Sequence, residues 1–316
     1  MSKSAERLCA VSVDLDEIPN YFAIHGLPLP TGPEAHAVYR TAIGRIESLA
    51  SWFRMPLTLF AVASDLRDAN SACKLRSMAA RGHEIANHSL DHRYDITRLD
   101  TESMRRQVVL AADLIERAVG ERPCGFRAPG YVVTDALIDV LREASLLYDS
   151  SVFPSPAYYL AKTAAMAFIR VQRRESHSIM GSPAVLLSPT CPYVPGLSVS
   201  QREEKGEHSD KLIELPIQVT PRLRLPYIGT TLTMAGFSMA KWLTRSVIGQ
   251  SFINLELHGI DVLDASDGLD ALVAHQPDVR VAAERKQLIL SEVFGMLREA
   301  GYSFVRLKDV ARRVRL

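Results

Sequence analysis

The stretch LCAVSVDLD at residues 8–16 opens the predicted fold. Its first part is an apolar run of the length and composition of a buried strand, and it ends in two carboxylates, Asp14 and Asp16. Side chains at positions i and i+2 of a strand point to the same side, so we expect both carboxylates to face one site. In α/β barrels, sites are built at this carboxyl end of the strands.

Apolar segments and helix-period segments alternate along the rest of the chain. Further strands are expected at 57–62, 83–87, 125–127, 146–149, 212–217, 252–257 and 303–306. Helices are expected at 35–53, 70–81, 101–119, 134–144 and 279–300, and a Pro- and Gly-rich loop between Pro19 and Pro33. This alternation predicts an α/β fold with mostly parallel strands.

Residues 151–209 do not follow the alternation of strands and helices, and we interpret them as an insertion after the fifth strand. We expect residues 1–316 to form one domain. The insertion holds AYYLAKTAAMAFIRVQRR at 157–174 and the charged run QREEKGEHSDK at 201–211. An apolar helix followed by basic residues can lie at a membrane interface. A helix packed on the barrel, a lid and a dimer contact are the alternatives.

The bulk composition excludes several classes of protein. Hydrophobic residues make up 47% and charged residues 23% of the 316 residues, which is typical of a soluble protein with a sizeable core. A net charge of +1 gives no basic surface for nucleic acid. The four cysteines form no CxxC pair and no apolar run reaches 18 residues, so neither a zinc knuckle nor a membrane-spanning helix is expected. We therefore expect a cytoplasmic location, with peripheral contact on the inner face of the membrane as an option.

A second group of candidate site residues lies in HEIANHSLDH at residues 83–92. The four-residue spacing of His88 and His92 would put both imidazoles on one face of a helical turn. Two histidines and the Asp16 carboxylate can hold a divalent metal with positions left open. Asp14 is then available as a base. An isolated HxxxH often arises by chance, and the joint occurrence with the two aspartates favours the metal site.

Four motifs in this order point to a known family: DLD at 14–16, NHSLDH at 87–92, FRAPGY at 126–131 and LELHG at 255–259. Together they resemble the polysaccharide deacetylase family, which has the NodB homology domain and is also called carbohydrate esterase family 4. The resemblance covers roughly residues 8–150 and 212–306. It implies a distorted (β/α) barrel of about seven strands with one metal ion. The SVD-x-D spacing resembles one branch of that family.

Carried onto this sequence, the resemblance makes Asp16, His88 and His92 the ligands of one divalent ion. Zinc is expected from this ligand set, and other divalent ions also suit it. Asp14 is implied to be the catalytic base, and Arg127 to hold that carboxylate ionised and oriented.

The last family motif implies that His258 protonates the leaving amine. A backbone N–H near Gly130 or Tyr131 is expected to stabilise the oxyanion, and Glu214 is a candidate substrate-binding residue.

The resemblance thus implies a metal-dependent N-deacetylase or deformylase, a hydrolase of C–N bonds other than peptide bonds. Its expected partner is an amino sugar, either polymeric or lipid-linked. Three alternatives stay open at this point. One is an amidase of a small cyclic amide, since some family members resemble allantoinases. The others are a non-catalytic binding protein of the same fold and a membrane-attached scaffold. The sugar, the acyl group and the oligomeric state cannot be derived from the sequence.

Overall fold

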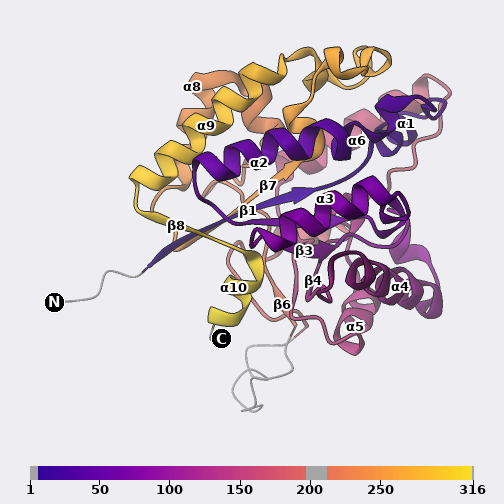
Figure 1. Ribbon diagram of the computed structural model, residues 1–316, viewed down its shortest axis with the longest axis horizontal. Helices are drawn as coiled ribbons and strands as arrows, with labels where there is room; N and C mark the ends of the chain where they lie inside the picture. Colours follow the sequence, from indigo (N-terminus) through magenta and orange to yellow (C-terminus); the bar gives the residue numbers. More distant parts are fainter. Residues whose placement is uncertain (1–5, 197–211, 315–316) are drawn as a thin grey trace. The chain divides into compact units, whose positions relative to one another are not determined.

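The computed structural model describes residues 6–196 and 212–314 (Figure 1). The charged run at 201–211, predicted as part of the insertion, lies outside the described residues. The chain forms two compact units, which we describe separately. The first unit comprises Met1–Leu59, Ser155–Ser178 and Gln218–Arg306, and the second comprises Phe60–Pro154, Ile179–Ile217 and Leu307–Leu316.

Strands and helices alternate as the sequence predicts. The strands are β1 (Arg7–Asp14), β2 (Leu57–Ala61), β3 (Glu84–Asn87), β4 (Gly125–Phe126), β5 (Tyr148–Asp149), β6 (Ile213–Glu214), β7 (Phe252–His258) and β8 (Tyr302–Val305). The helices are α1 (Ile18–Ile24), α2 (Ile43–Trp52), α3 (Ala69–Ala80), α4 (Thr101–Val119), α5 (Asp135–Glu143), α6 (Pro156–Val171), α8 (Gly229–Val247), α9 (Ala283–Glu299) and α10 (Leu307–Arg313). The strand order is β6-β5-β4-β3-β2-β1-β7, with β8 pairing off this path onto β1. The described residues therefore confirm the α/β class and its mostly parallel strands.

In the first unit, strand β1 has parallel partners on both sides. Its register with β7 pairs Leu8 with Phe252 at one end and Asp14 with His258 at the other, and β8 pairs with the first half of β1. All of β1 beyond its first two residues is buried, which explains its apolar run. The shared register brings the carboxyl ends of β1 and β7 to the same edge.

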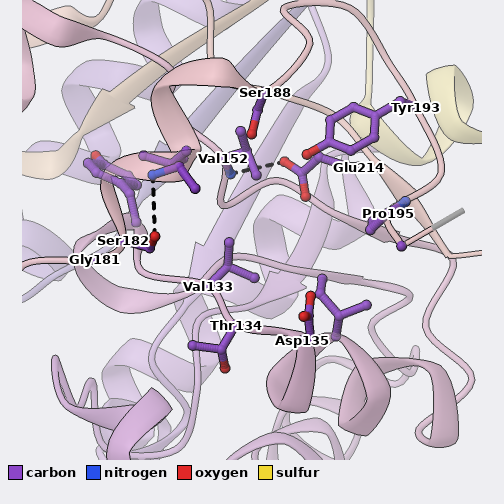
Figure 2. A pocket seen from close by; sticks show the side chains of 15 residues that line it. Val133, Thr134, Asp135, Val152, Gly181, Ser182, Ser188, Tyr193, Pro195 and Glu214 are labelled. Carbon is purple, nitrogen blue, oxygen red and sulfur yellow. Dashed lines mark hydrogen bonds between the residues drawn. The ribbon is translucent and has the colours of Figure 1, made fainter. Parts of the chain in front are cut away.

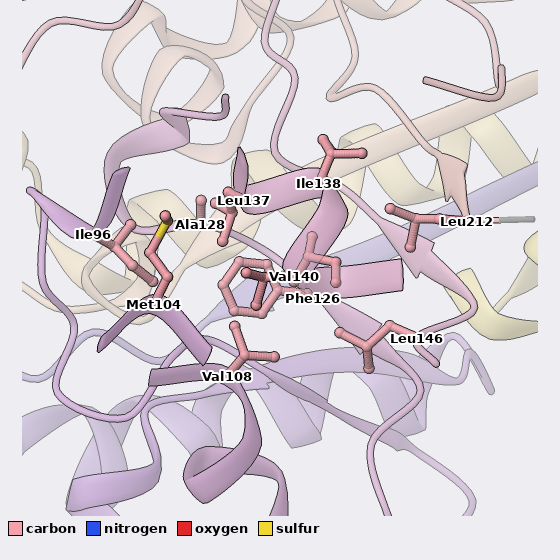
Figure 3. Close-up of a cluster of buried hydrophobic side chains, with 11 residues drawn as sticks. Ile96, Met104, Val108, Phe126, Ala128, Leu137, Ile138, Val140, Leu146 and Leu212 are labelled. Atoms are coloured by element: carbon pink, nitrogen blue, oxygen red, sulfur yellow. The ribbon is translucent and has the colours of Figure 1, made fainter. Parts of the chain in front are cut away.

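In the second unit, β3, β4, β5 and β6 pair in parallel in that order. A Cβ at Gly125 would collide with the ring of Tyr148 on the neighbouring strand, so only glycine fits there. The unit has a hydrophobic core of buried side chains from β4, α4, α5 and nearby loops (Figure 3). Its members are Ile96, Met104, Val108, Phe126, Ala128, Leu137, Ile138, Val140, Leu141, Leu146 and Leu212.

Capping residues explain where the predicted helices begin and end. Asp100 accepts a hydrogen bond from the backbone N–H of Ser103 at 2.9 Å and begins α4. Gly120, with a φ of 86°, ends that helix in the left-handed conformation. Thr134 caps α5 in the same way as Asp100 caps α4. The bounds expected at 70–81, 101–119 and 134–144 are therefore correct to within one residue, whereas α9 begins four residues after its expected start.

Three predicted segments differ from the structure. The loop expected between Pro19 and Pro33 contains α1. The helix expected at 35–53 begins with a 3₁₀ turn and a π-helical turn at Val38–Ala42 before it becomes α2. The strand expected at 212–217 is reduced to β6, and Pro216 has no N–H to continue the ladder.

Helix α8 is absent from the expectations. Its sequence is rich in threonine, which has a low helix propensity, and it holds Gly236, where a φ of 76° interrupts the helix. Packing against α9 stabilises it instead. Tertiary contacts therefore override a weak local signal.

The predicted insertion begins after β5 and contains α6, followed by a 3₁₀ helix at Pro183–Leu187. Among the described helices, none is both long and apolar enough to cross a membrane. The four cysteines are free thiols, of which Cys9 is buried and both Cys73 and Cys191 are exposed. The assignment of residues 1–316 to a single catalytic domain stays a prediction.

Candidate active site

In the first unit, the candidate acid and base lie on neighbouring strands. Asp14 is the last residue of β1 and is paired in register with His258, the last residue of β7. Glu256 lies two residues before His258, on the same face of the strand. One ligand atom from each of these three side chains lies within 4.8 Å of those of the other two. Strand alternation and register alone therefore assemble a cluster of two carboxylates and one imidazole.

Acidic groups surround the imidazole of His258. Its Nδ1 lies 2.8 Å from Oε1 of Glu256, and its Nε2 lies 3.9 Å from Oδ2 of Asp16. Burial alone would lower the pKa of His258, but the negative charges of Glu256, Asp16 and Asp14 outweigh burial and hold this pKa well above its usual value. These carboxylates therefore favour the protonated form of the imidazole.

Asp261, a fully buried residue, stabilises the loop after β7 through two hydrogen bonds. Its Oδ2 accepts a hydrogen bond from the backbone N–H of His258 at 2.8 Å, and its Oδ1 accepts one from the Thr230 hydroxyl at 2.7 Å. Burial raises the pKa of Asp261 to about 6. These contacts orient the end of β7, and with it the His258 ring.

In the second unit, His88 and His92 follow β3, and their rings lie next to each other with centroids 4.9 Å apart. The expectation of a helical turn is wrong, because residues 88–93 form an irregular loop. Ser89 and His92 have positive φ angles of 69° and 52°, and the Ser89 hydroxyl accepts a hydrogen bond from the His92 N–H. A strained turn, not a helix, brings the imidazoles together.

One ring nitrogen of His88 has a defined role. Its Nδ1 lies 2.8 Å from the backbone oxygen of Arg127, which can only accept a hydrogen bond. Nδ1 therefore carries the proton, and Nε2 has the lone pair that a metal ion needs. The ring of His92 packs edge-on against the ring of Tyr94, with the two ring centroids 4.8 Å apart. His88 and His92 are both buried.

Arg127 is fully buried, which rules out a surface arginine at this position. Its Nε donates to the backbone oxygen of Ser150 at 2.8 Å, and its Nη2 donates to the Ser150 hydroxyl at 2.9 Å. The guanidinium carbon lies 4.1 Å from the ring centroid of Phe60. These contacts hold the planar cation in one orientation.

The expected substrate-binding residues occupy a second part of this unit. Tyr131 and Glu214 line a pocket of about 430 Å³, whereas Gly130 is not among the lining residues. The backbone N–H of Tyr131 donates to the oxygen of Ala128 at 3.0 Å, so this N–H is engaged within the loop. Residues of the insertion, among them Ser182 and Tyr193, also line the pocket (Figure 2).

Glu214 forms a buried pair with a residue that the sequence did not single out. It is paired in register with Asp149 on β5, and both side chains are fully buried. Oε1 of Glu214 accepts the Val152 N–H at 3.0 Å (Figure 2), and Oδ1 of Asp149 accepts the Ser151 hydroxyl at 2.6 Å. Burial, together with the Asp149 charge, raises the pKa of Glu214 well above its usual value. Burial and the neighbouring carboxylate therefore favour the protonated form of Glu214.

The sequence analysis did not single out two residues of the candidate site, Glu256 and Asp149. A different feature of the sequence points to each of them. Glu256 follows from strand alternation, since it lies two positions before a candidate histidine. Asp149 stands at the end of a short strand, where α/β folds place functional groups.

Comparisons with known proteins agree with this architecture. Residues 40–148 match the family model described as polysaccharide deacetylase. This match is to the same family that the motifs predict. Membership of the SVD-x-D branch stays a prediction.

A peptidoglycan-N-acetylglucosamine deacetylase of Bacillus cereus is 26% identical over 128 residues, which are 40% of this chain and 56% of that protein. Matches to the curated relatives span only 25 to 56% of their own lengths.

Two solved structures share the fold over almost the whole chain. A probable polysaccharide deacetylase of Pseudomonas aeruginosa PAO1 aligns with a TM-score of 0.58 at 15% identity, covering 98% of this chain and 90% of that one. An allantoinase aligns with a TM-score of 0.58 at 17% identity, covering 99% and 91%. The predicted fold class, a NodB-like (β/α) barrel, is thereby confirmed. The same fold carries more than one amide-hydrolysing activity, so the fold alone does not select a substrate.

Proposed function

We propose that the protein is a metal-dependent amide hydrolase that removes an acetyl or formyl group from an amino sugar. The observation that carries the proposal is the cluster of Asp14, Glu256 and His258 at one edge of parallel strands. It offers a carboxylate base beside an imidazolium acid. Amide hydrolysis needs both groups, because water must lose a proton and the departing nitrogen must gain one.

Asp16, His88 and His92 are proposed as the ligands of one divalent ion, with zinc favoured. Each of the three side chains offers a ligand atom, a carboxylate oxygen or an imidazole nitrogen. The donor chemistry fits, because the proton on Nδ1 of His88 leaves Nε2 as a ligand, and because Asp16 is a buried carboxylate. A bound ion would supply Lewis-acid polarisation of the amide carbonyl and of water.

The remaining steps use side chains of this chain. Asp14 takes the proton of the attacking water, and Arg127 is proposed to favour the ionised form of that carboxylate. Nδ1 of His258 is engaged by Glu256, so Nε2 is the atom that donates a proton to the departing nitrogen. A free amine and a carboxylic acid are released. Glu214, Gly130 and Tyr131 are proposed to contact the substrate, two of them from the pocket.

The substrate class follows from the family and from the insertion. The family and the Bacillus cereus relative support an N-acylated amino sugar. We propose a lipid-linked amino sugar as the particular form, on a protein of cytoplasmic location that contacts the membrane peripherally. The surface of α6 described below supports this choice.

The proposal is tested by acyl release. Purified protein loaded with Zn²⁺ would be given N-acetylglucosamine oligomers, a bacterial lipid extract and allantoin in separate reactions, and acetate and formate would be followed by proton NMR. Asp14→Asn is the control. Release from oligomers or lipid supports the amino-sugar proposal. Turnover of allantoin alone would replace it with a small cyclic amide. An absence of turnover on all three, in protein shown to contain metal, would favour a binding role.

A further inference from the structure

Helix α6 turns its apolar side away from the protein. Only Ile169 among its residues is buried. Leu160, Phe168 and Val171 are 69%, 63% and 80% exposed. At 100° per residue these three positions, together with the exposed Ala164, share one face opposite Ile169. A surface helix normally directs its apolar stripe inward, so this helix has the reverse arrangement.

The turn next to α6 extends the same exposed surface. The hydroxyl of Ser155, the N-cap of α6, donates to the backbone oxygen of Arg224 at 2.8 Å. This bond ties the start of the helix to a turn in which Leu223 is 67% exposed. Arg222 and Arg224 hold this turn with positive φ angles. The exposed side chain of Leu223, which lies between Arg222 and Arg224 in the chain, is therefore beside the N-terminus of α6.

The two chain segments that contain this surface have basic residues but no acidic ones. No Asp or Glu occurs between Asp149 and Glu175, or between Glu214 and Glu256. Over the whole chain, by contrast, acidic and basic residues are nearly equal in number, at 36 and 37. The basic residues of the two segments are Lys162, Arg170, Arg173, Arg174, Arg222, Arg224, Lys241 and Arg245. Arg170 and Arg173 are exposed at the end of α6, where its apolar face ends.

We propose that the α6 surface, comprising Leu160, Phe168, Val171, Leu223 and the exposed arginines Arg170, Arg173 and Arg222, docks on an anionic lipid bilayer. Apolar side chains enter the boundary of the acyl chains, and the arginines pair with lipid phosphates. Docking of this surface would bring the protein to the bilayer that holds a lipid-linked substrate. The identity of that substrate rests on the proposed function. Lipid binding itself needs no turnover.

The positive charge of the arginines favours an anionic bilayer, rather than a second copy of the chain, as the partner of the α6 surface. In a dimer formed through this face, the arginines of one copy would lie against those of the other, and like charges in an interface are destabilising. A bilayer with anionic headgroups satisfies the apolar face and the basic rim together. Self-association through α6 is therefore the competing outcome that the experiment must detect.

The test is sedimentation of the full-length protein with vesicles. Vesicles of phosphatidylcholine alone would be compared with vesicles that also contain phosphatidylglycerol. We expect the wild type to bind the anionic vesicles at least about tenfold more strongly, and the binding to weaken with salt. Two variants, Phe168→Glu with Val171→Glu, and Arg170→Gln with Arg173→Gln, should each lose about tenfold or more of this affinity.

Leu288→Glu is the matched control, because Leu288 on α9 is 61% exposed and lies outside the proposed surface. It should bind vesicles as the wild type does. Equal loss in this control, or no binding of the wild type to anionic vesicles, would overturn the inference. So would dimers in sedimentation velocity that the Phe168→Glu, Val171→Glu variant abolishes.

The two proposals can fail separately. Asp14→Asn should bind vesicles unchanged, so vesicle binding without acyl release contradicts only the catalytic proposal. Acyl release from oligomers without vesicle binding contradicts only the membrane inference. Circular dichroism of the α6 variants excludes loss of fold as the cause of weaker binding.

Discussion

Nδ1 of His258 lies 2.8 Å from Oε1 of Glu256, a carboxylate with no exposed surface. The two residues are one strand repeat apart on β7, so the contact follows from the pleat of the strand alone. A carboxylate on one ring nitrogen fixes which nitrogen faces the reaction and favours the protonated ring. A neighbouring residue on β7 therefore orients His258, the proposed acid, and favours its protonated form.

Glu256→Gln should move the alkaline limb of the pH–rate profile to lower pH. His258 must be protonated to donate, so activity falls as pH rises through its pKa. The Glu256 charge and hydrogen bond raise that pKa against burial, and their removal lowers it. We expect kcat at neutral pH to fall by roughly tenfold to hundredfold. The measurements are kcat against pH and an NMR titration of the imidazole. An unshifted limb would show that His258 is not the group that titrates.

Asp14→Asn should abolish turnover and keep the metal. The amide has nearly the shape of the carboxylate and cannot accept the proton of water, so a fall in kcat of roughly 10²–10⁴-fold is expected. Metal content by elemental analysis should remain at the wild-type level. Asp16→Asn is the paired variant, and it should lose metal. If Asp14→Asn lost the metal and Asp16→Asn retained it, the proposed roles of the two aspartates would be exchanged.

Chelation should lower the thermal stability of the metal-loaded protein. A ligand that binds only the folded state at about 100 times its Kd stabilises that state by about 2.7 kcal/mol. Removal of the ion should therefore lower Tm by several degrees, and added Zn²⁺ should restore it. His92→Ala should have the lower Tm from the start and should not respond to chelator. A chelator response in His92→Ala equal to that of the wild type would remove His92 from the ligand set.

The parts of the fold that follow from local pattern were predictable. The apolar run before Asp14 and the glycine after α4 determine a strand and a helix end with little help from distant residues. Helix α8 was not predictable, because its threonines and Gly236 argue against a helix and its stability comes from α9.

The candidate site shows the same division. The spacing of His88 and His92 predicted two adjacent rings, but for the wrong reason, since the positive φ at Ser89 cannot be derived from a serine in a sequence. The pair of Asp149 and Glu214 depends on the register of β5 with β6. Two residues 65 positions apart meet only when that register is known.

Glu214→Gln should make protein stability less dependent on pH. Burial and Asp149 raise the pKa of Glu214 in the folded state, whereas in the unfolded chain it stays near the model-peptide value. Above that unfolded value the unfolded chain releases a proton that the folded protein retains, so the free energy of unfolding decreases as pH rises toward the folded pKa. Glutamine carries no proton to lose. Its Oε1 can still accept the Val152 N–H, and its amide can donate to Asp149.

The measurement is Tm between pH 5 and pH 9 for wild type and Glu214→Gln. The variant should equal the wild type near pH 5 and exceed it increasingly at higher pH. Glu34→Gln is the control, because Glu34 belongs to the first unit and takes no part in the carboxyl pair. It should follow the wild-type curve. A constant Tm difference across the pH range would mean that the substitution changes packing or a hydrogen bond, and that Glu214 is ionised in the folded protein.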